Sequence, residues 1–255
     1  MTFQPKITII IAVKNAKDLL AETLSSIRSQ VYQPIEVVVI DGNSTDGTQK
    51  IIEENRDIIP YFVSEQDEGI SDAFNKGLKL ATGDYINFQG AGDLLYAPDS
   101  LSKLMEGCTN HDILICGKVM RVQENGITPI WIAPKNKRFN LNSLLFKMPL
   151  PHQGLFTHRS FFEQFGVFDK KVKFAMDYEL LLRAYHQFPK TVMKSVIVSK
   201  WRAGGVGSNR IFDIFDEYDR IKKQHKVASK STLWMLDRYS RLKYILKAKI
   251  LRLSY

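Results

Sequence analysis

The sequence predicts an α/β protein: one domain with a mixed, mainly parallel central sheet, followed by a basic helical appendage. In residues 7–93, short runs of β-branched and apolar residues alternate with stretches of helical periodicity. This alternation is typical of strands joined by crossover helices. Residues 94–208 are less regular, with strand-like and helical stretches mixed. From residue 212 to the end, the periodicity is helical.

The first two strands are expected at Ile7–Val13 and Ile35–Ile40. Both runs are apolar enough to be buried on both faces of a parallel sheet. Asn15 follows the first strand and is expected to cap the helix that comes next. After the second strand, a turn rich in capping residues leads into a helix at Gln49–Asn55.

The next elements repeat the pattern. We expect a third strand at Ile58–Ser64, a helix at Ile70–Leu80 and a short buried strand at Tyr85–Phe88. Strands that alternate with helices are joined by right-handed crossovers, which makes them parallel. The carboxyl ends of these strands should therefore meet at one edge of the sheet.

Carboxylates stand at three of these expected strand ends. Asp41 ends the second strand, Glu65 and Asp67 follow the third, and Asp93 closes the Gly-Ala-Gly-Asp loop after the fourth. Ligands of open α/β sheets bind just beyond the carboxyl ends of the strands. This edge is the predicted ligand site.

In the second half, a helix is expected at Asp99–Glu106. Ile113–Gln123 and Ile127–Ile132 read as a β-hairpin, because an Asn125-Gly126 pair stands between them. Leu150–Thr157 is strand-like.

The last elements of this half are a helical turn at Phe161–Phe165, a helix at Met176–His186 and a strand at Thr191–Lys200. The helix holds Asp177 in its first turn. A glycine-rich loop, Ala203 to Gly207, follows the strand.

Composition indicates an ordinary globular protein. The 255 residues are 44% hydrophobic and 25% charged. Cys108 and Cys116 do not resemble a secreted disulfide framework and cannot form a zinc site by themselves. No stretch has the features of a signal peptide or the apolar length of a membrane span. We therefore expect a cytoplasmic protein.

The net charge of +9 is unevenly placed. Residues 220–255 hold eleven Lys or Arg and one acid, so residues 1–219 sum to about −1. In this tail an apolar stripe is flanked by basic residues, as in helices that lie on an anionic membrane surface. The alternative is that the stripe packs on the domain. The stripe comprises Met235, Tyr239, Leu242, Leu246, Ile250 and Leu253, and the basic residues are Arg238, Arg241, Lys243, Lys247, Lys249 and Arg252.

Five segments, in order and spacing, resemble the bacterial family 2 glycosyltransferases of GT-A fold. They are ITIIIAVKNA, VVVIDGNSTDGT, GISDAFNKGLKLATGDYINF, HQGLFTHRSFFEQFGVFD and AMDYELLLRA. The resemblance covers roughly residues 6–205. It implies a GT-A domain at residues 1–208, made of a nucleotide-sugar half (1–93) and an acceptor half (94–208). Residues 209–255 form the basic amphipathic tail.

The resemblance implies a donor site at the ends of the first strands. Asp41 would contact the base, although it could instead cap the next helix. Asp72 would touch the base or ribose, the alternative being a salt bridge with Lys76 one helical turn away. Val13 and Asn15 complete the expected nucleotide-binding residues.

Asp93 is the expected ligand of a divalent ion, Mn²⁺ or Mg²⁺. The family has a carboxylate pair or triplet at this loop, and only its last acid remains in Gly90-Ala91-Gly92-Asp93. One carboxylate is a poor cage for such an ion, so we expect the ion to arrive with the donor's diphosphate. It would neutralise charge on the leaving group.

Asp177 is the expected general base, which removes a proton from the acceptor hydroxyl during an in-line, inverting displacement. The alternative is an acid that only complements the helix dipole. His152, Gln153, Trp201 and Arg202 are weaker candidates for contact with the acceptor or the diphosphate. A hydrogen-bonded core histidine is the ordinary alternative for His152.

The resulting hypothesis is an inverting, metal-assisted glycosyltransferase of the hexosyl or N-acetylhexosaminyl class. It would use a nucleotide-diphosphate sugar, expected to be a UDP-sugar, and act on a lipid-linked or nascent bacterial glycan at the inner face of the plasma membrane. Exopolysaccharide, capsule or lipopolysaccharide synthesis is the setting that the resemblance implies. The processive signature Q-x-x-R-W is absent, so one sugar per acceptor is expected.

Two alternatives remain open from the sequence. A sugar-1-phosphate nucleotidyltransferase would need a glycine-rich basic loop after the first strand, where Ala12-Val13-Lys14-Asn15 is a poor match. A degenerate, non-catalytic glycan-binding scaffold would explain the missing carboxylates before Asp93. Nucleic acid is not an expected partner, because the basic tail has no recognisable groove-reading module.

Overall fold

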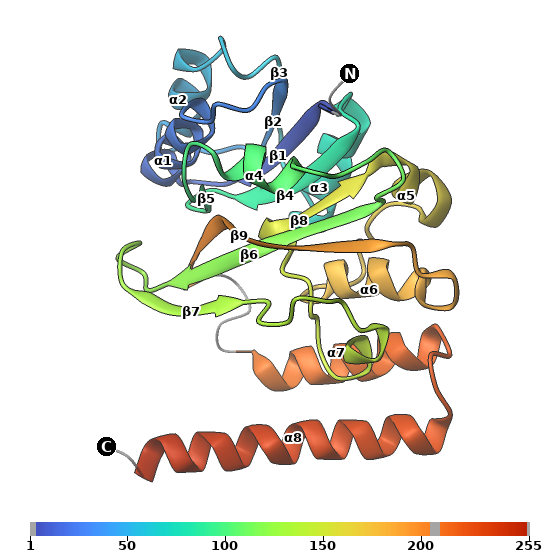
Figure 1. The fold of residues 1–255 in the computed structure, drawn as a ribbon. Coiled ribbons are helices and arrows are strands. Elements are labelled where there is room, and N and C mark those ends of the chain that lie inside the picture. The colour runs from blue at the N-terminus through green and yellow to red at the C-terminus, as the bar shows by residue number, and fades with distance from the viewer. Residues whose placement is uncertain (1–3, 205–209, 254–255) are drawn as a thin grey trace.

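The computed structural model of the chain describes residues 4–204 and 210–253, with side chains described up to residue 246. A nine-stranded mixed sheet forms its centre (Figure 1), in the order β3-β2-β1-β4-β8-β6-β9-β5 with β7 beside β6. The strands are β1 (Ile7–Val13), β2 (Ile35–Asp41), β3 (Tyr61–Ser64), β4 (Tyr85–Gly90), β5 (Leu94–Leu95), β6 (Leu114–Val122), β7 (Pro129–Ala133), β8 (Leu155–His158) and β9 (Thr191–Arg202).

Helices cover both faces of the sheet. The α-helices are α1 (Lys17–Arg28), α2 (Thr48–Glu54), α3 (Ile70–Leu80), α4 (Ser100–Met105), α5 (Arg159–Phe165), α6 (Met176–Arg183), α7 (Ile211–Gln224) and α8 (Lys230–Leu253). Short 3₁₀ helices are η1 (Leu141–Leu145), η2 (His152–Gly154) and η3 (Tyr185–Gln187). The predicted α/β class is confirmed. The predicted order of elements holds except for the short strand β5, which was not expected, and the helix predicted at Met176–His186 ends at Arg183.

The predicted mixed sheet has its parallel part in the first half of the chain. Strands β1 to β4 pair only in parallel among themselves. β8 then joins β4 in antiparallel fashion, and β6 and β7 form the predicted antiparallel hairpin. β9 returns parallel to β6, so the two halves share one continuous sheet.

Two apolar cores lie on opposite faces of this sheet. Ile10 of β1 and Phe74 of α3 belong to the core that also contains Tyr178 of α6. Ile9 of β1 and Leu24 of α1 belong to the other. Full burial of such side chains stabilises a fold by roughly 1.5–3 kcal/mol each.

The prediction that Asn15 caps α1 is wrong. The residue before α1 is Ala16, and its side chain makes no capping hydrogen bond. The Asp46 carboxylate accepts from the backbone N–H of Lys17 instead (3.1 Å), so the loop after β2 supplies the cap. The Asn15 amide oxygen accepts from Thr45 N (2.9 Å).

Two strand boundaries differ from the prediction. β3 starts at Tyr61, because the residues before it form a turn in which Ile58 N and Ile59 N both donate to Asn55 O. The strand-like run from residue 150 is wrong in its first part. Pro151 precedes the 3₁₀ turn η2, and β8 begins only at Leu155.

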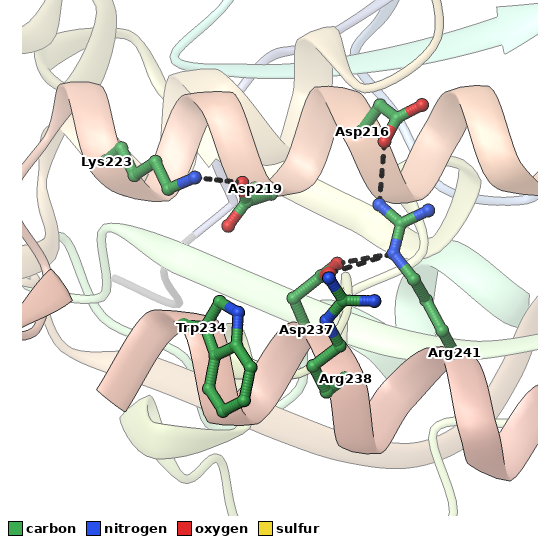
Figure 2. Close-up of a pocket in the computed structure, with 7 residues that line it drawn as sticks. All are labelled: Asp216, Asp219, Lys223, Trp234, Asp237, Arg238 and Arg241. Carbon is green, nitrogen blue, oxygen red and sulfur yellow. Dashed lines mark hydrogen bonds and ion pairs between the residues drawn. The ribbon is translucent and has the colours of Figure 1, made fainter. Parts of the chain in front are cut away.

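The first tail helix packs on the domain. Ile221 of α7 is fully buried and Lys222 is nearly so. α8 runs back along α7, and Arg241 links the two by pairing with Asp216 of α7 and Asp237 of α8, as Figure 2 shows. α7 is therefore part of the folded unit, and it carries α8.

The apolar stripe of α8 is largely exposed, although the ring of Tyr239 lies 6.3 Å from that of Phe146 in the domain. Met235, Tyr239, Leu242 and Leu246 are each more than half exposed, so the alternative that the stripe packs on the domain holds only for the edge-to-face contact of Tyr239. No described helix is both long and apolar enough to cross a membrane. The other predicted members of the stripe and its flanks, Ile250, Leu253, Lys247, Lys249 and Arg252, lie outside the described side chains.

A buried carboxylate links the amino ends of β1 and β2 to the segment before β4. Glu36 of β2 is 3% exposed and accepts hydrogen bonds from Lys6 Nζ (2.6 Å), Thr8 Oγ1 (2.7 Å) and Thr82 N (2.7 Å). Burial opposes its ionisation, but the hydrogen bonds from Lys6, Thr82 and Thr8 outweigh burial and lower the pKa of Glu36 to about 2.

Glu36→Gln should therefore destabilise the fold by roughly 2–3 kcal/mol at pH 7. Because the folded pKa lies below the ordinary value of 4.5, the wild-type advantage is complete above that pH and is lost as the pH falls towards 2. Urea unfolding of both proteins at pH 7 and pH 3 measures it. Glu54→Gln, at an exposed position of α2, is the matched control, and an equal loss at both pH values would contradict the assignment.

Candidate active site

The carboxyl ends of the parallel strands meet at one edge, as predicted. The register pairs Val13 with Asp41 and Asp41 with Ser64, and it pairs Ala12 with Gly90 on the other side of β1. The loops that follow these strands therefore start side by side. Asp93 comes three residues after Gly90 and lies on the same edge.

Asp41 is fully buried beneath this edge. Its carboxylate accepts hydrogen bonds from Ser44 N (3.1 Å), from the Ser44 hydroxyl, from Ser64 Oγ (2.6 Å) and from Gln49 Nε2 (3.4 Å). The N-cap of α2 is Gly47, which makes no side-chain cap, so the alternative that Asp41 caps that helix is wrong. Asp41 organises the loop after β2, and its contact with a base stays a prediction.

Val13 and Asn15 tie the loop after β1 to the loop after β2. Val13 O accepts from Gly42 N (2.8 Å). Asn15 N donates to Ser44 Oγ (2.7 Å), and Asn15 has φ +47°, a conformation that asparagine tolerates better than most residues. The two residues stand at the predicted nucleotide edge, where no structural observation tests their contact with a nucleotide.

Asp72 of α3 forms the predicted salt bridge with Lys76 (3.3 Å) and a second one with Lys170 (3.3 Å). Burial opposes ionisation, but the hydrogen bond from Glu68 N and the two lysines outweigh it and hold the pKa of Asp72 below its usual range. Lys170 follows α5 in the second half of the chain. These ion pairs therefore join the two halves along one side of the site.

Asp93 is nearly buried, at 7% exposure. Its Oδ2 accepts from Gly90 N (3.0 Å) and from Gln153 Nε2 (3.2 Å). Burial raises the pKa of Asp93, while His152 and these hydrogen bonds oppose the rise. The carboxylate is thus held in one orientation by its own loop and by η2.

A buried amide network supports Gln153 from below. Gln89 Nε2 donates to Gln153 O (3.1 Å) and to Asn87 Oδ1 (2.7 Å), and Asn87 Nδ2 donates to Leu155 O (3.0 Å). Asn87, Gln89 and Gln153 are all at most 4% exposed. Gln153 was predicted to contact a ligand, and the structure places it as a support of Asp93.

His152 contacts Asp177, one of the two predicted carboxylates. Its Nδ1 lies 3.7 Å from Asp177 Oδ2, an ion-pair contact longer than a hydrogen bond. Burial disfavours the imidazolium, but the carboxylates of Asp177 and Asp93 outweigh it and raise the pKa of His152. The side chains of His152 and Asp177 are 30% and 23% exposed, respectively, so solvent reaches both. Two consecutive residues of η2, His152 and Gln153, thus contact Asp177 and Asp93, which come from opposite halves of the chain.

The described residues do not form a ready-made metal cage. No group of three His, Cys, Asp or Glu side chains within residues 4–204 and 210–246 is placed to hold an ion. Asp93 supplies one hard oxygen ligand, and Mg²⁺ or Mn²⁺ needs several. The site fits an ion that brings most of its ligands with a diphosphate better than it fits a resident ion.

Helix α6, which carries Asp177, is held at its start by α7. Glu217 accepts hydrogen bonds from three successive backbone N–H groups, Lys173 N (2.8 Å), Phe174 N (2.8 Å) and Ala175 N (2.9 Å). A carboxylate there satisfies free N–H groups and complements the helix dipole. No sequence pattern predicts this contact, because Glu217 lies more than forty residues from the groups that it binds.

Trp201 and Arg202 end β9 and differ in their surroundings. The Arg202 guanidinium pairs with Glu22 of α1, so the predicted phosphate contact would require it to leave that partner. The ring of Trp201 lies 5.7 Å from that of Trp131 in β7 and below the guanidinium of Arg121 in β6. Arg121 lies two residues after Val119, on the same face of β6. A cation on the face that Val119 buries is the sequence signal that could have singled out Arg121.

A cavity of about 350 Å³ lies elsewhere, between α7 and α8. Figure 2 shows its charged walls, in which Asp219 pairs with Lys223 and Arg241 with Asp216 and Asp237. None of the predicted site residues lines it. Its charges are largely paired with one another, so the strand-edge site is the better candidate for chemistry.

Comparison with known proteins identifies the family of the chain. A family profile described as Glycosyl transferase family 2 matches residues 8–166. A "PGL/p-HBAD biosynthesis glycosyltransferase" of Mycobacterium bovis is 31% identical over 216 residues, which cover 82% of this chain and 81% of that protein. An uncharacterized glycosyltransferase of Rickettsia typhi is 28% identical over 189 residues, 70% of this chain and 58% of that one.

Solved structures with the same architecture include two nucleotide-sugar complexes. S. aureus TarS 1–349 in complex with UDP-GlcNAc superposes with a TM-score of 0.69 at 17% identity, over 92% of this chain and 71% of that one. The mannosyltransferase PcManGT from Pyrobaculum calidifontis, in complex with GDP-Man and Mn²⁺, gives 0.58 at 24% identity, over 88% and 64%. At these identities the similarity establishes the fold, and the expected GT-A fold is confirmed.

The contact of Glu217 with the start of α6 predicts a stability effect. Glu217→Ala leaves three N–H groups without their acceptor and should lower the free energy of unfolding by about 2–3 kcal/mol. Chemical denaturation measures the change. Asp213→Asn, at a half-exposed position on the same helix, is the control and should change stability by less than about 0.5 kcal/mol. Equal stability of wild type and Glu217→Ala would show that the contact contributes nothing.

Proposed function

The chain belongs to glycosyl transferase family 2, and on that premise we propose that it transfers one sugar from a UDP-sugar, with inversion, to a hydroxyl of a lipid-linked or nascent bacterial glycan. The observation that carries this proposal is the contact of His152 with Asp177 beside the carboxylate of Asp93. Such a displacement requires a base on the side of the acceptor hydroxyl. On the side of the leaving diphosphate it is helped by a carboxylate that can hold a divalent ion.

In the proposed reaction the acceptor oxygen attacks the anomeric carbon while the bond from that carbon to the diphosphate oxygen breaks. Asp177 accepts the proton of the acceptor hydroxyl, and the nucleoside diphosphate leaves on the side of Asp93. His152 contacts Asp177, and the next residue, Gln153, donates to Asp93. The side chain of His152 is a positioning group for Asp177.

On the donor side, Val13, Asn15, Asp41 and Asp72 surround the proposed nucleotide site. The neighbouring TarS structure contains a uridine nucleotide sugar, which supports a UDP-sugar here. For Asp41 to accept from the base, one of its present donors, such as Ser64 Oγ or Gln49 Nε2, has to give way. Gln49 makes the weakest of these hydrogen bonds.

Asp93 would hold a divalent ion bound to the donor's diphosphate. When bound, such an ion supplies positive charge to the leaving group. The Mn²⁺ in the PcManGT structure supports this choice of ion. Gln153 and Gly90 N both donate to Oδ2, and the backbone of Arg202 also hydrogen-bonds to the carboxylate, so Asp93 is held in one orientation.

The acceptor is proposed to be held at a membrane. The exposed stripe of α8 is apolar, and the described basic residues Arg238 and Lys243 are exposed beside it. An apolar face with cationic flanks suits the anionic inner face of a bacterial plasma membrane. This arrangement, and transfer of a single sugar, supports a role in cell-envelope glycan synthesis rather than in nucleotidyl transfer.

Asp177→Asn tests the assignment of the base. We expect kcat to fall by about 10²–10⁴-fold, because the amide cannot accept the proton. The affinity for UDP should stay within twofold. Product formation from UDP-sugars and a lipid-linked acceptor, with Mn²⁺, is followed by mass spectrometry. Asp99→Asn, a half-exposed acid before α4, is the control, and full activity of Asp177→Asn would reject the assignment.

Leu242→Glu tests the membrane surface. It places a negative charge in the exposed stripe and should weaken binding to vesicles of anionic phospholipid by at least about tenfold. Co-sedimentation at low and high salt measures the binding. Gln224→Glu makes the same charge change on an exposed position of α7 and should have a much smaller effect. Equal loss in both variants would point to non-specific charge attraction instead of the stripe.

A further inference from the structure

A cluster of one arginine and two tryptophans lies on the acceptor half of the sheet. Arg121 of β6 pairs in register with Trp131 of β7 on one side and with Trp201 of β9 on the other. Its guanidinium carbon lies 4.7 Å from the centre of the Trp201 ring and 6.0 Å from that of Trp131. The two indole rings meet edge to face at 5.7 Å. We call this group the arginine–tryptophan cluster.

Arg121 differs from the other arginines near the site because it has no anionic partner among the described residues. Arg202 pairs with Glu22 and Arg183 with Glu179. Arg121 has no ion pair with the described part of the chain, and its Nε is buried without a hydrogen-bond partner. Leaving a buried donor of a charged group unsatisfied costs free energy. The guanidinium can therefore bind an oxyanion, because its planar fork of N–H donors matches two oxygens of a phosphate or carboxylate.

The cluster adjoins the site that holds Asp93 and His152. Ser199 precedes Trp201 by two residues, so both side chains lie on the same face of β9. Ser199 Oγ donates to Leu94 O (3.0 Å), next to Asp93, and Ser199 pairs with Val119 of β6. Val119 in turn packs against Gly154 of η2. The cluster thus lies two residues along β6 and β9, about 7 Å, beyond Val119 and Ser199, which border the site.

The place of the arginine–tryptophan cluster in the fold indicates that it would bind the acceptor and not the donor. All three residues come from β6, β7 and β9, whereas the proposed nucleotide residues come from the ends of β1 and β2 and from α3. Figure 1 shows the β6–β7 hairpin and the end of β9 together at one side of the sheet, away from α2 and β3. Asp93 stands between these two groups, because its loop joins β4 to β5 and β5 pairs with β9.

We propose that the arginine–tryptophan cluster is an acceptor subsite, in which Arg121 binds a phosphate oxyanion of the acceptor and the partly exposed surface of the two indoles packs on the adjoining sugar ring. An aromatic ring offers a large, rigid apolar surface for such packing. This inference rests on the proposed function and names the chemistry of its acceptor: a sugar attached to a phosphate or diphosphate.

The kinetic test uses two acceptors with the same sugar, one attached to an alkyl diphosphate and one to a neutral alkyl chain. Arg121→Met keeps the apolar stem and removes the charge. We expect it to raise KM for the diphosphate acceptor by at least about tenfold, with little change in kcat, in KM for the neutral acceptor or in the affinity for UDP. Arg121→Lys should restore part of the loss, because it keeps the charge without the fork.

Arg56→Met is the matched control, because Arg56 also lies over an aromatic ring, that of Phe62, but far along the chain from the cluster. An equal rise in KM for both acceptors would overturn the proposal. A loss of UDP affinity in Arg121→Met would assign the guanidinium to the donor's diphosphate and would also overturn it.

A binding test separates this inference from the proposed function. In a Trp234→Phe background, Trp131 and Trp201 are the remaining tryptophans, so their fluorescence reports on the cluster. Inorganic pyrophosphate should change this fluorescence in the parent protein and not in Arg121→Met. If neither acceptor is a substrate but pyrophosphate gives this response, the proposed acceptor reaction fails and the oxyanion site stands. If pyrophosphate changes neither protein, the oxyanion site is refuted.

Discussion

The pair of consecutive residues His152 and Gln153 is the constraint on which the candidate site depends, because His152 contacts Asp177 and Gln153 donates to Asp93. Asp93 follows a parallel strand of the first half, and Asp177 starts a helix of the second. Burial opposes the protonated imidazole, but the negative charges of Asp177 and Asp93 favour it and raise the pKa of His152. η2 can hold His152 beside Asp177 because Gln153, the next residue, is anchored to β4 by Asn87 and Gln89. A buried amide network therefore sets the position of η2, and with it that of His152.

The second half of the chain supports the site from two further directions. Lys170 reaches Asp72 across the domain, and Glu217 of α7 holds the start of α6. The helices after residue 210 are thus connected to the residue proposed as the base. α7 supports the chemistry on one side, and on the other it carries α8, whose apolar stripe is exposed. The proposed catalytic and membrane-facing parts of the protein are joined by one helix.

The apolar periodicity of the sequence predicted the helices and strands whose bounds depend on neighbouring residues. Ile7–Val13 and Ile70–Leu80 have the bounds that their apolar periodicity indicates, and the strand ends meet because parallel crossovers require it. The cap of α1 was missed because Asp46 lies about thirty residues away, and the contacts of Glu217 and Lys170 were missed for the same reason. A contact between distant residues leaves no periodicity in the sequence. The deviation at η2 has a local cause, Pro151, which the strand-like pattern around it concealed.

The central claim is that Asp93 and Asp177 face one bound donor from opposite sides. Diffraction from crystals grown with Mn²⁺ and a non-transferable UDP-sugar analogue, recorded at the manganese edge, tests it most directly. The account predicts an anomalous peak about 2.0–2.6 Å from an Asp93 carboxylate oxygen, with Asp177 on the face of the anomeric carbon opposite the diphosphate. A nucleotide bound at this edge with Asp177 turned away from the sugar, or one bound elsewhere on the protein, would contradict it.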